Sequence, residues 1–471
     1  MKNYEQDGRM KKPDTNTKIL IRRQKYLFSL EQQFYNHPTI FDLDMDRILS
    51  RQWIYVCHAS EIGWEQYITY DILNESIIIC REKPSYEYPD GKINSFFNVC
   101  RHRGSKICTE KKGSAKNFTC PYHGWNYTLD GKLQSAPFMN NNRNKDESQA
   151  FNLDDYNLHK CDLRILEGMV FISLAEASND TAYWGAIKEN ITPWIKPYTI
   201  IDTKVAHKQK YNVPANWKLV VENFRECYHC KTAHPEYSEI NDFVKTAHNC
   251  KGDEVDENSN SFFSNLLNGR EFTREFQKEY IRKMRDQDRL YGSDSWQIAA
   301  QPIQVWAQPI NDGIKTMTKN GKPVSKLLGK LKEYDGGETG VILSTFSYLY
   351  AFNDYVAILR FTPISVNETE IEITWLVHKD AVDVNKNDLI WLWNITTIQD
   401  IQIIKNNQKG INSSKYKPGP YSHVKEISTW NFISWYLWRL SGDEEKLMPS
   451  NLYNSKDKDD LMTDLAGTLL G

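Results

Sequence analysis

The sequence predicts an α+β protein in which a small antiparallel β domain precedes a larger domain that combines helices with a sheet. Residues 67–82, 93–100 and 168–174 alternate apolar and polar side chains, which is typical of half-buried strands. Apolar residues between positions 219 and 227 recur at about the spacing of a helix. The chain has 471 residues, which is enough for two or three domains that each have a core.

The charge pattern excludes some partners. The formal net charge is -2 at pH 7, so the composition does not favour a polyanion. The basic runs at Lys11-Lys12 and Lys111-Lys112 are short and typical of solvated surface. No uninterrupted apolar run approaches the roughly 18 residues that a membrane span needs. We therefore expect neither a nucleic acid nor a membrane as a partner.

The cysteines and the start of the chain indicate a cytoplasmic location. Nine cysteines are scattered over the sequence, and an odd, dispersed set is not a disulfide framework. The first 18 residues are polar and lack the apolar stretch of a signal peptide. Residues 1–51 are expected to form a tail and a helix that pack with the larger domain.

Two mixed cysteine and histidine pairs lie in residues 98–125, NVCRHRGSKICTEKKGSAKNFTCPYHGW. Cys100 and His102 form a C-x-H pair, and after seventeen intervening residues Cys120 and His123 form a C-x-x-H pair. Two thiolates on one iron and two imidazoles on the other suit a [2Fe–2S] cluster. A Cys2His2 zinc finger instead pairs cysteine with cysteine and histidine with histidine.

These two loops resemble those of Rieske proteins very closely. High-potential respiratory Rieske proteins carry one further cysteine in each loop, and the two are joined as a disulfide. Ser105 and Tyr122 stand at those places here, and Cys108 lies beyond the first of them and is expected to be a buried structural thiol. The resemblance implies an antiparallel Rieske [2Fe–2S] domain over residues 52–175, of the lower-potential type that serves oxygenases.

A second cluster of potential ligands lies in residues 223–236, NFRECYHCKTAHPE. Its C-x-x-C and histidines suit a zinc site or a redox dithiol, and its acids and histidines suit an oxygen-handling iron site. On a predicted helix Glu222, Glu226 and His229 fall at i, i+4 and i+7 and share one face. Cys227 and Cys230 are expected to pack against that helix or line it.

His234 joins His229 only if the helix distorts or ends between them, because five residues are about 140° on an ideal helix. Pro235 follows His234 and biases that residue out of the α region, so we expect an end there. Two imidazoles and one carboxylate on one face suit iron(II) and leave positions open for dioxygen.

The chain resembles Rieske non-haem iron oxygenases, whose pattern of an acid, x-x-His, x4 and His is matched by Glu226, His229 and His234. The resemblance implies that both histidines bind Fe(II) and that Glu226 is not a ligand. In the family this acid accepts hydrogen bonds from a histidine of the iron site and from a Rieske histidine of the neighbouring subunit. It thereby bridges the electron path.

The third iron ligand is expected from Asp400, because the family has an aspartate at this place on a helix. Asp354 and Asp380 are weaker candidates in strand-like or turn contexts, and the alternative for Asp400 is an ordinary exposed helix acid. The resemblance also implies a catalytic domain over residues 176–471, with an antiparallel sheet packed by helices in the helix-grip manner.

The variant "ENFRECYH" indicates a branch of the family. Many ring-hydroxylating members have aspartate as the bridge and one more residue between it and the preceding asparagine. The shorter spacing with glutamate resembles the glycine betaine, choline and carnitine oxygenases, which implies hydroxylation or N-demethylation of a small quaternary ammonium or N-methyl substrate. Aromatic faces bind such cations. Candidate pocket rings are Trp306, Tyr348, Tyr350 and Phe352, although strand aromatics more often belong to a core.

The resemblance implies that this chain has the partners of a terminal oxygenase. The reaction consumes O₂ and a small-molecule substrate, and a separate NAD(P)H-dependent reductase is expected because the chain has no G-x-G-x-x-G site. Bridging between subunits implies a homotrimer. An aromatic-ring-hydroxylating dioxygenase alpha subunit that forms cis-diols is the alternative, and an electron-transfer Rieske protein is a third class that would need no second iron site.

The charged residues 252–290 fall outside these motifs. They are expected to form exposed helices that serve as a lid, as a trimer contact or simply as a solvated surface.

Overall fold

The computed structural model describes residues 11–139, 151–175, 181–241, 274–298, 301–311 and 313–441. The chain divides into two compact units. One comprises Trp53–Asn179, and the other comprises Met1–Gln52 together with Asp180–Gly471. Both units combine antiparallel sheet with helical segments, so the α+β prediction is confirmed.

The smaller unit is built from three antiparallel sheets. A four-stranded sheet has the order β4-β3-β2-β5, and two three-stranded sheets have the orders β6-β7-β8 and β1-β10-β9. Residues 67–82 form a hairpin rather than one strand, since β2 and β3 pair along their whole length. The strands are β1 (Ile54–His58), β2 (Gln66–Ile72), β3 (Glu75–Arg81), β4 (Ile93–Phe97), β5 (Lys112–Ser114), β6 (Asn117–Thr119), β7 (Asn126–Thr128), β8 (Leu133–Ser135), β9 (Asp162–Leu166) and β10 (Met169–Ser173).

The core of the smaller unit lies beneath the two Cys/His loops. Cys100 and Cys120 are 3% and 2% exposed and belong to one apolar cluster with Trp125 and Tyr127. Cys108 is also buried in this cluster, as the sequence predicted. The loops are therefore anchored by their cysteines, which sit in the core of the domain.

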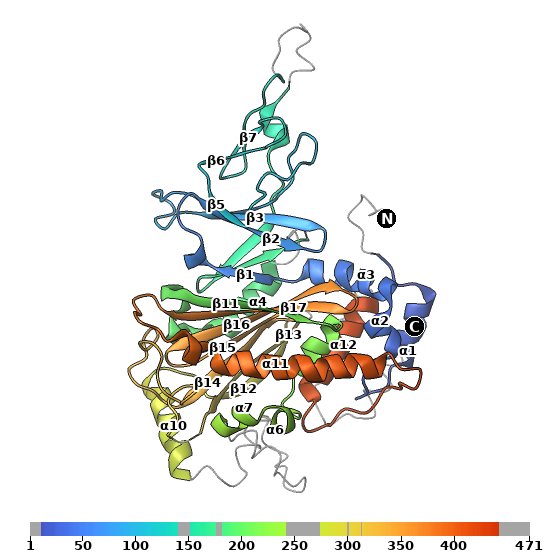
Figure 1. Cartoon of the computed structure of the whole chain (residues 1–471), viewed down its shortest axis with the longest axis vertical. Helices are drawn as coiled ribbons and strands as arrows, with labels where there is room; N and C mark the ends of the chain where they lie inside the picture. Colours follow the sequence, from blue (N-terminus) through green and yellow to red (C-terminus); the bar gives the residue numbers. More distant parts are fainter. Residues whose placement is uncertain are drawn as a thin grey trace. The chain divides into compact units, whose positions relative to one another are not determined.

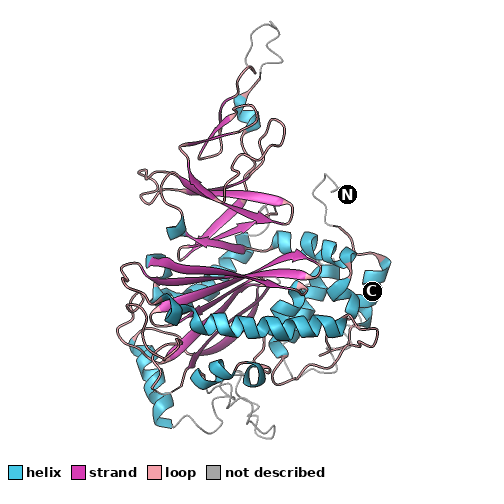
Figure 2. Ribbon diagram, in the orientation of Figure 1, coloured by secondary structure: helices cyan, strands magenta, loops and turns pink. Residues whose placement is uncertain are grey.

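The larger unit is organised on one seven-stranded antiparallel sheet with the order β11-β17-β16-β15-β14-β13-β12 (Figures 1 and 2). Residues of β14, β15 and most of β16 are buried on both faces, which requires cover on both sides of the sheet. The strands are β11 (Thr203–Val213), β12 (Gly292–Ile298), β13 (Gln301–Pro309), β14 (Gly337–Ser344), β15 (Ser347–Ala351), β16 (Tyr355–Ser365) and β17 (Glu368–His378).

One long helix, α11 (Lys386–Ile411), runs along this sheet (Figure 1). The Asn385 side chain caps its first turn, and its buried residues recur at helical spacing through Leu389, Trp393, Thr396 and Asp400. The stripe therefore presents Asp400 on the buried side of the helix. The other helices of this unit are α1 (Thr15–Arg23), α2 (Gln32–Asn36), α3 (Pro38–Arg47), α4 (Thr181–Ile195), α5 (Trp217–Asn223), α6 (Cys230–Ala233), α7 (Pro235–Ile240), α10 (Arg274–Asp286) and α12 (Ile427–Ser441).

Within the larger unit, a buried ion pair joins the N-terminal helices to the helix α5. Asp44 of α3 pairs with Lys218 of α5, and neither side chain is exposed. Tyr436 of α12 and the Trp217 indole donate hydrogen bonds to the same carboxylate at 2.8 and 3.1 Å. These donors satisfy a charge that would otherwise be costly to bury.

The charged segment is only partly described. Its C-terminal part forms α10, in which Tyr280 and Met284 are buried, whereas residues 242–273 lie outside the described residues. Five short 3-10 turns complete the described elements, at Leu49–Arg51, Ala59–Glu61, Leu153–Tyr156, Lys196–Tyr198 and Ile200–Asp202. Within the described part of the chain, no helix is both long and apolar enough to cross a membrane.

Candidate metal centres and the adjoining cavity

The structure brings the four predicted cluster ligands together. The rings of His102 and His123 lie 4.6 Å apart between centroids, and the Cys100 and Cys120 thiols are close enough to hydrogen-bond. Both cysteines are buried, while both imidazoles are exposed. Two thiols and two imidazoles brought together in this way fit the donor set of a [2Fe–2S] cluster.

Both loops repeat one backbone pattern. Gly104 N donates to Cys100 O and Gly124 N donates to Cys120 O, each at 3.0 Å. Each cysteine N–H is in turn bonded to a carbonyl five residues later. The two glycines have φ of 74° and 72°, a left-handed conformation that a side chain disfavours. The spacing therefore builds two matching ligand loops.

Two aromatic residues contact the cluster ligands. The Tyr127 hydroxyl lies 3.4 Å from Cys100 Sγ and accepts the Arg101 N–H at 3.1 Å, so its own proton is free for the sulfur. The Trp125 ring stacks on His102 with centroids 4.9 Å apart. Both contacts are with predicted cluster ligands, so they would orient those ligands when a cluster is bound.

The second site departs from the predicted helix. α5 ends at Asn223, so Glu226 and His229 are not on it, and the prediction that Glu222 shares a face with them is wrong. Glu222 instead accepts hydrogen bonds from Tyr35 and Tyr421, both at 2.9 Å. The break has a local cause, because the Glu226 carboxylate accepts the N–H groups of Tyr228 and His229 and so replaces helical backbone bonds.

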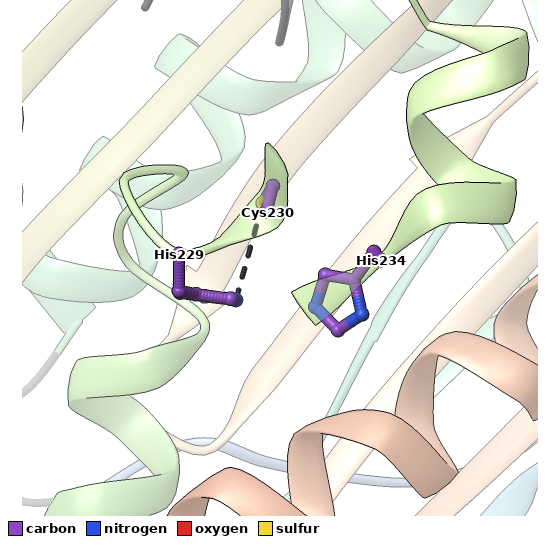
Figure 3. A group of neighbouring side chains, drawn as sticks. All are labelled: His229, Cys230 and His234. Carbon is purple, nitrogen blue, oxygen red and sulfur yellow. Dashed lines mark hydrogen bonds between the residues drawn. The ribbon is translucent and has the colours of Figure 1, made fainter. Parts of the chain in front are cut away.

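The predicted end at His234 is confirmed. α6 stops at Ala233 and α7 begins at Pro235, and His234 lies between them with φ −126° and ψ 73°. This bend turns the His234 ring toward His229, with centroids 5.1 Å apart (Figure 3). The two imidazoles therefore face one space despite their unfavourable helical spacing.

Asp400 completes a three-residue cluster. Its Oδ1 lies 3.0 Å from His234 Nε2 and 3.3 Å from His229 Nε2. Asp400 and His234 are 3% and 1% exposed. The two rivals lie elsewhere. Asp354 is held by Thr316 and the Val324 N–H, and Asp380 is exposed in the turn after β17.

Each imidazole is oriented by a partner on its far nitrogen. His229 Nδ1 contacts the Glu226 carboxylate. His234 Nδ1 lies 2.9 Å from Gln399 Oε1, and Gln399 Nε2 donates to Glu236 Oε2 at 2.7 Å. Because the far nitrogens are engaged, both Nε2 atoms are directed at Asp400, which is the orientation of imidazoles that share a metal ion with a carboxylate.

The electrostatics of this cluster favour a cation. Although burial lowers the pKa of His229, its hydrogen bonds to Asp400 and Glu226 raise that pKa to about 10. Burial raises the pKa of Asp400, but hydrogen bonds from His229 and His234 outweigh it and leave the pKa below the usual range. These shifts show that a positive charge on His229 is stabilised beside Asp400 and Glu226, and the two imidazoles and one carboxylate fit iron(II).

The two cysteines of C-x-x-C border the same space. Cys230 Sγ lies 3.9 Å from His229 Nε2 (Figure 3). The sulfur and nitrogen donors of His229, Cys230 and His234 all lie within 4.8 Å of one another. Cys227 is more exposed and lies in the loop between α5 and α6, so only Cys230 is on a helix.

A cavity of about 110 Å³ adjoins the cluster. Of the predicted aromatic residues, Trp306 and Tyr350 line it, whereas Tyr348 packs on Phe361 and Phe352 on Tyr355. Other residues that line the cavity could not be predicted from the sequence, because no local motif marks them. Among them are Tyr237, Gln308, Glu338 and Trp393.

Comparison with known proteins matches two parts of the chain to known domain families. Residues 52–156 match the Rieske [2Fe-2S] domain, and residues 201–442 match the ring hydroxylating alpha subunit catalytic domain. The glycine betaine monooxygenase oxygenase subunit of Pseudomonas aeruginosa UCBPP-PA14 is 33% identical over 430 residues, 90% of this chain and 92% of that protein. The chain is a Rieske oxygenase alpha subunit. It is therefore the terminal, catalytic component of a Rieske non-haem iron oxygenase and is related to quaternary ammonium monooxygenases.

More distant relatives share the fold of this Rieske oxygenase. The carnitine monooxygenase oxygenase subunit of Acinetobacter pittii is 34% identical over 44% of this chain and 52% of its own. A solved quaternary ammonium Rieske monooxygenase superposes with a TM-score of 0.62 at 19% identity, over 93% of this chain and all of that one. Naphthalene 1,2-dioxygenase from Rhodococcus sp. gives the same TM-score at 17% identity, over 91% and 99%. Structural similarity alone therefore does not distinguish a monooxygenase from a dioxygenase.

Proposed function

We propose that this alpha subunit hydroxylates an N-methyl carbon, or a carbon beside the nitrogen, of a small quaternary ammonium or N-methyl substrate. The observation that carries the proposal is the full-length similarity to glycine betaine monooxygenase oxygenase subunits. The cavity agrees with it in size. One water needs roughly 10–15 Å³, so the cavity suits a ligand of about ten non-hydrogen atoms or fewer.

Seven residues are assigned to two centres in this proposal. His229, His234 and Asp400 would hold one iron(II), and the [2Fe–2S] cluster would be held by Cys100, His102, Cys120 and His123. When bound, the cluster supplies electrons one at a time and the mononuclear iron supplies the activation of O₂. The buried thiols and the cation-favouring triad support this assignment.

The chain's own side chains prepare the site for that chemistry. Gln399 and Glu226 hold the two imidazoles in the tautomer that leaves Nε2 available, because each occupies the Nδ1 side. The aromatic lining keeps water from the reacting carbon.

The overall reaction balances with O₂ and two electrons. An N-methyl group, O₂, two electrons and two protons give an N-hydroxymethyl group and water. The N-hydroxymethyl compound then breaks its C–N bond to release formaldehyde, a proton and the demethylated amine.

Glu226 is proposed as the bridge along which reducing equivalents reach the site from the Rieske domain of a neighbouring subunit. Its position beside His229, outside the proposed iron ligands, supports this role. A bridge between subunits needs a ring, so we propose a homotrimer. The electrons would come from an NAD(P)H-dependent reductase.

Replacing Glu226 by Gln tests the bridge. Gln keeps the shape but loses the charge, so we expect turnover to fall about 100-fold or more while both metal centres stay loaded. Steady-state formaldehyde release, iron content and the visible spectrum of the cluster measure these quantities. Normal turnover in Glu226→Gln would refute the role.

An aromatic-ring dioxygenase is the second candidate, since the anthranilate 1,2-dioxygenase large subunit of Acinetobacter baylyi is 27% identical over half of this chain. The reaction type is decided by products. The loaded enzyme with reductase and O₂ would be given glycine betaine, carnitine or an arene. Formaldehyde from a methylammonium compound supports the proposal, and a cis-diol from an arene overturns it. An electron carrier would instead contain about two iron atoms per chain rather than three.

A further inference from the structure

Beyond the triad, the cavity contains one buried carboxylate that the proposed reaction does not use. Glu338 of β14 is 1% exposed and lines the same cavity as His229, His234 and Asp400. Gln308 Nε2 donates to its Oε1 at 2.5 Å, whereas Oε2 is buried with no hydrogen-bond partner of good geometry among the described residues. No lysine or arginine of the described chain forms an ion pair with it. A carboxylate left in this state is costly unless a ligand compensates it.

Strand register surrounds this carboxylate with aromatic rings. Gln308 lies opposite Glu338 across β13 and β14, and in the next row on the same face Trp306 lies opposite Gly340. Gly340 in turn lies opposite Tyr350 on β15. A Cβ at Gly340 would fall 2.0 Å from the Trp306 ring, so the glycine lets the indole lie across the strand.

The rings form one continuous wall. Trp306 and Tyr350 meet edge to face with centroids 5.9 Å apart, and Tyr350 stacks on Trp393 of α11 at 4.2 Å. Burial raises the pKa of the Tyr237 and Tyr350 hydroxyls. The charge of Glu338 adds to this effect at both, after that of Cys227 in the case of Tyr350, which indicates that both hydroxyls lie near the carboxylate. Aromatic faces and a buried carboxylate without an ion-pair partner among the described residues both attract a cation.

We propose that Glu338 is the specificity-determining residue of this cavity, and that with Trp306, Tyr350 and Trp393 it forms the subsite for a quaternary ammonium head group. This assignment rests on the proposed function and names the residue that would determine its substrate specificity. A positively charged substrate in this cavity, beside His229, His234 and Asp400, needs a compensating anion. Glu338 supplies that charge from the sheet, where no proposed iron ligand lies.

Burial raises the pKa of Glu338 to about 7, against smaller opposite effects of hydrogen bonds from Gln308 and Trp306. The carboxyl is thus easily protonated near neutral pH, and a bound cation would favour its charged form.

The test compares two ligands that differ only in charge at one atom. Glycine betaine and 3,3-dimethylbutanoate have the same shape, with carbon replacing the quaternary nitrogen. Binding to the iron-loaded enzyme would be measured without O₂ by calorimetry and by quenching of tryptophan fluorescence. In the wild type we expect glycine betaine to bind more tightly. In Glu338→Gln the ratio of the two affinities should fall about 30-fold or more, because the variant no longer favours the cationic head group over its uncharged isostere.

Matched variants separate specificity from folding. Glu222→Gln changes a carboxyl outside the cavity, and burial raises the pKa of this carboxyl to about 7 as well. The affinity ratio should therefore not change in this variant. Glu338→Asp keeps the charge and should retain most of the preference. If Glu338→Gln does not fold, Trp306→Leu provides an independent measurement and should lower the ratio about 3- to 30-fold.

The outcomes distinguish the two proposals. A wild-type preference for glycine betaine that persists in Glu338→Gln and in Trp306→Leu overturns the subsite while the proposed function stands. A wild type that binds 3,3-dimethylbutanoate as tightly as glycine betaine overturns the subsite. If it also releases no formaldehyde from methylammonium compounds, the proposed function fails as well.

Discussion

The two candidate metal centres of this Rieske oxygenase are assembled in opposite ways. The four cluster donors lie within 24 consecutive residues on two loops of the smaller unit. The mononuclear triad joins His234 to Asp400, 166 residues later, on the longest helix of the larger unit. The cluster imidazoles are exposed, whereas His234 and Asp400 are almost completely buried.

This difference agrees with the roles proposed for the two centres. Exposed imidazoles on short loops suit a group that passes electrons to a partner, and two matching turns are enough to hold them. A site that brings O₂ and a substrate together needs a dry cavity, so its ligands have to come from elements that pack around that cavity. The first centre is thus a property of local turns, and the second is a property of tertiary packing.

The largest effect that would distinguish the two centres is expected from the loss of Asp400. We expect Asp400→Ala to lower iron from about three to about two atoms per chain and to reduce turnover at least about 100-fold, since two imidazoles alone leave the site without its anionic ligand. The visible spectrum of the cluster should persist. Iron analysis and absorption spectroscopy measure both effects.

Two variants control that experiment. Cys120→Ser should give the reverse result, with the cluster spectrum lost and about one iron retained. Asp354→Asn removes a buried carboxylate outside the cavity and should keep all the iron. If Asp354→Asn lost the mononuclear iron and Asp400→Ala kept it, the assignment of the triad would be wrong.

The same contrast explains how much could be predicted from the sequence. Spacing alone located Cys100, His102, Cys120 and His123, because local turns bring them together. Pro235 correctly predicted the bend at His234. Asp400 came from family resemblance, since no local pattern connects residues so far apart.

Tertiary effects account for what was missed. Apolar periodicity predicted one helix through Glu226 and His229, but the Glu226 side chain bonds the backbone and the helix ends at Asn223. Glu338 reaches Trp306 and Gln308 only through the pairing of β13 with β14. Periodicity does not report a side chain that competes for backbone bonds, nor which strands will pair.

A smaller effect is expected from the partner of His234. Gln399→Leu removes the acceptor on His234 Nδ1 and leaves Glu236 without its donor, while the three proposed ligands remain. Loss of such a partner typically weakens metal affinity about 10- to 100-fold. Competition with a calibrated chelator under anaerobic conditions measures the affinity. Gln402→Leu on the exposed side of the same helix is the control and should change nothing. Unchanged iron affinity in Gln399→Leu would show that packing alone orients the ring.

The smallest effect belongs to the other centre, where a hydrogen bond tunes a ligand without holding it. Tyr127→Phe removes the hydroxyl 3.4 Å from Cys100 Sγ and keeps the ring. A hydrogen bond to a thiolate stabilises the reduced cluster, so its loss should lower the reduction potential. A bond worth about 1 kcal/mol corresponds to roughly 40 mV for one electron. A spectroscopic redox titration measures the shift. Tyr122→Phe removes a hydroxyl that bonds Arg103 instead of a cysteine, so it should leave the potential nearly unchanged. Equal shifts in both variants would assign the effect to general polarity near the exposed imidazoles, because only Tyr127 touches a sulfur donor.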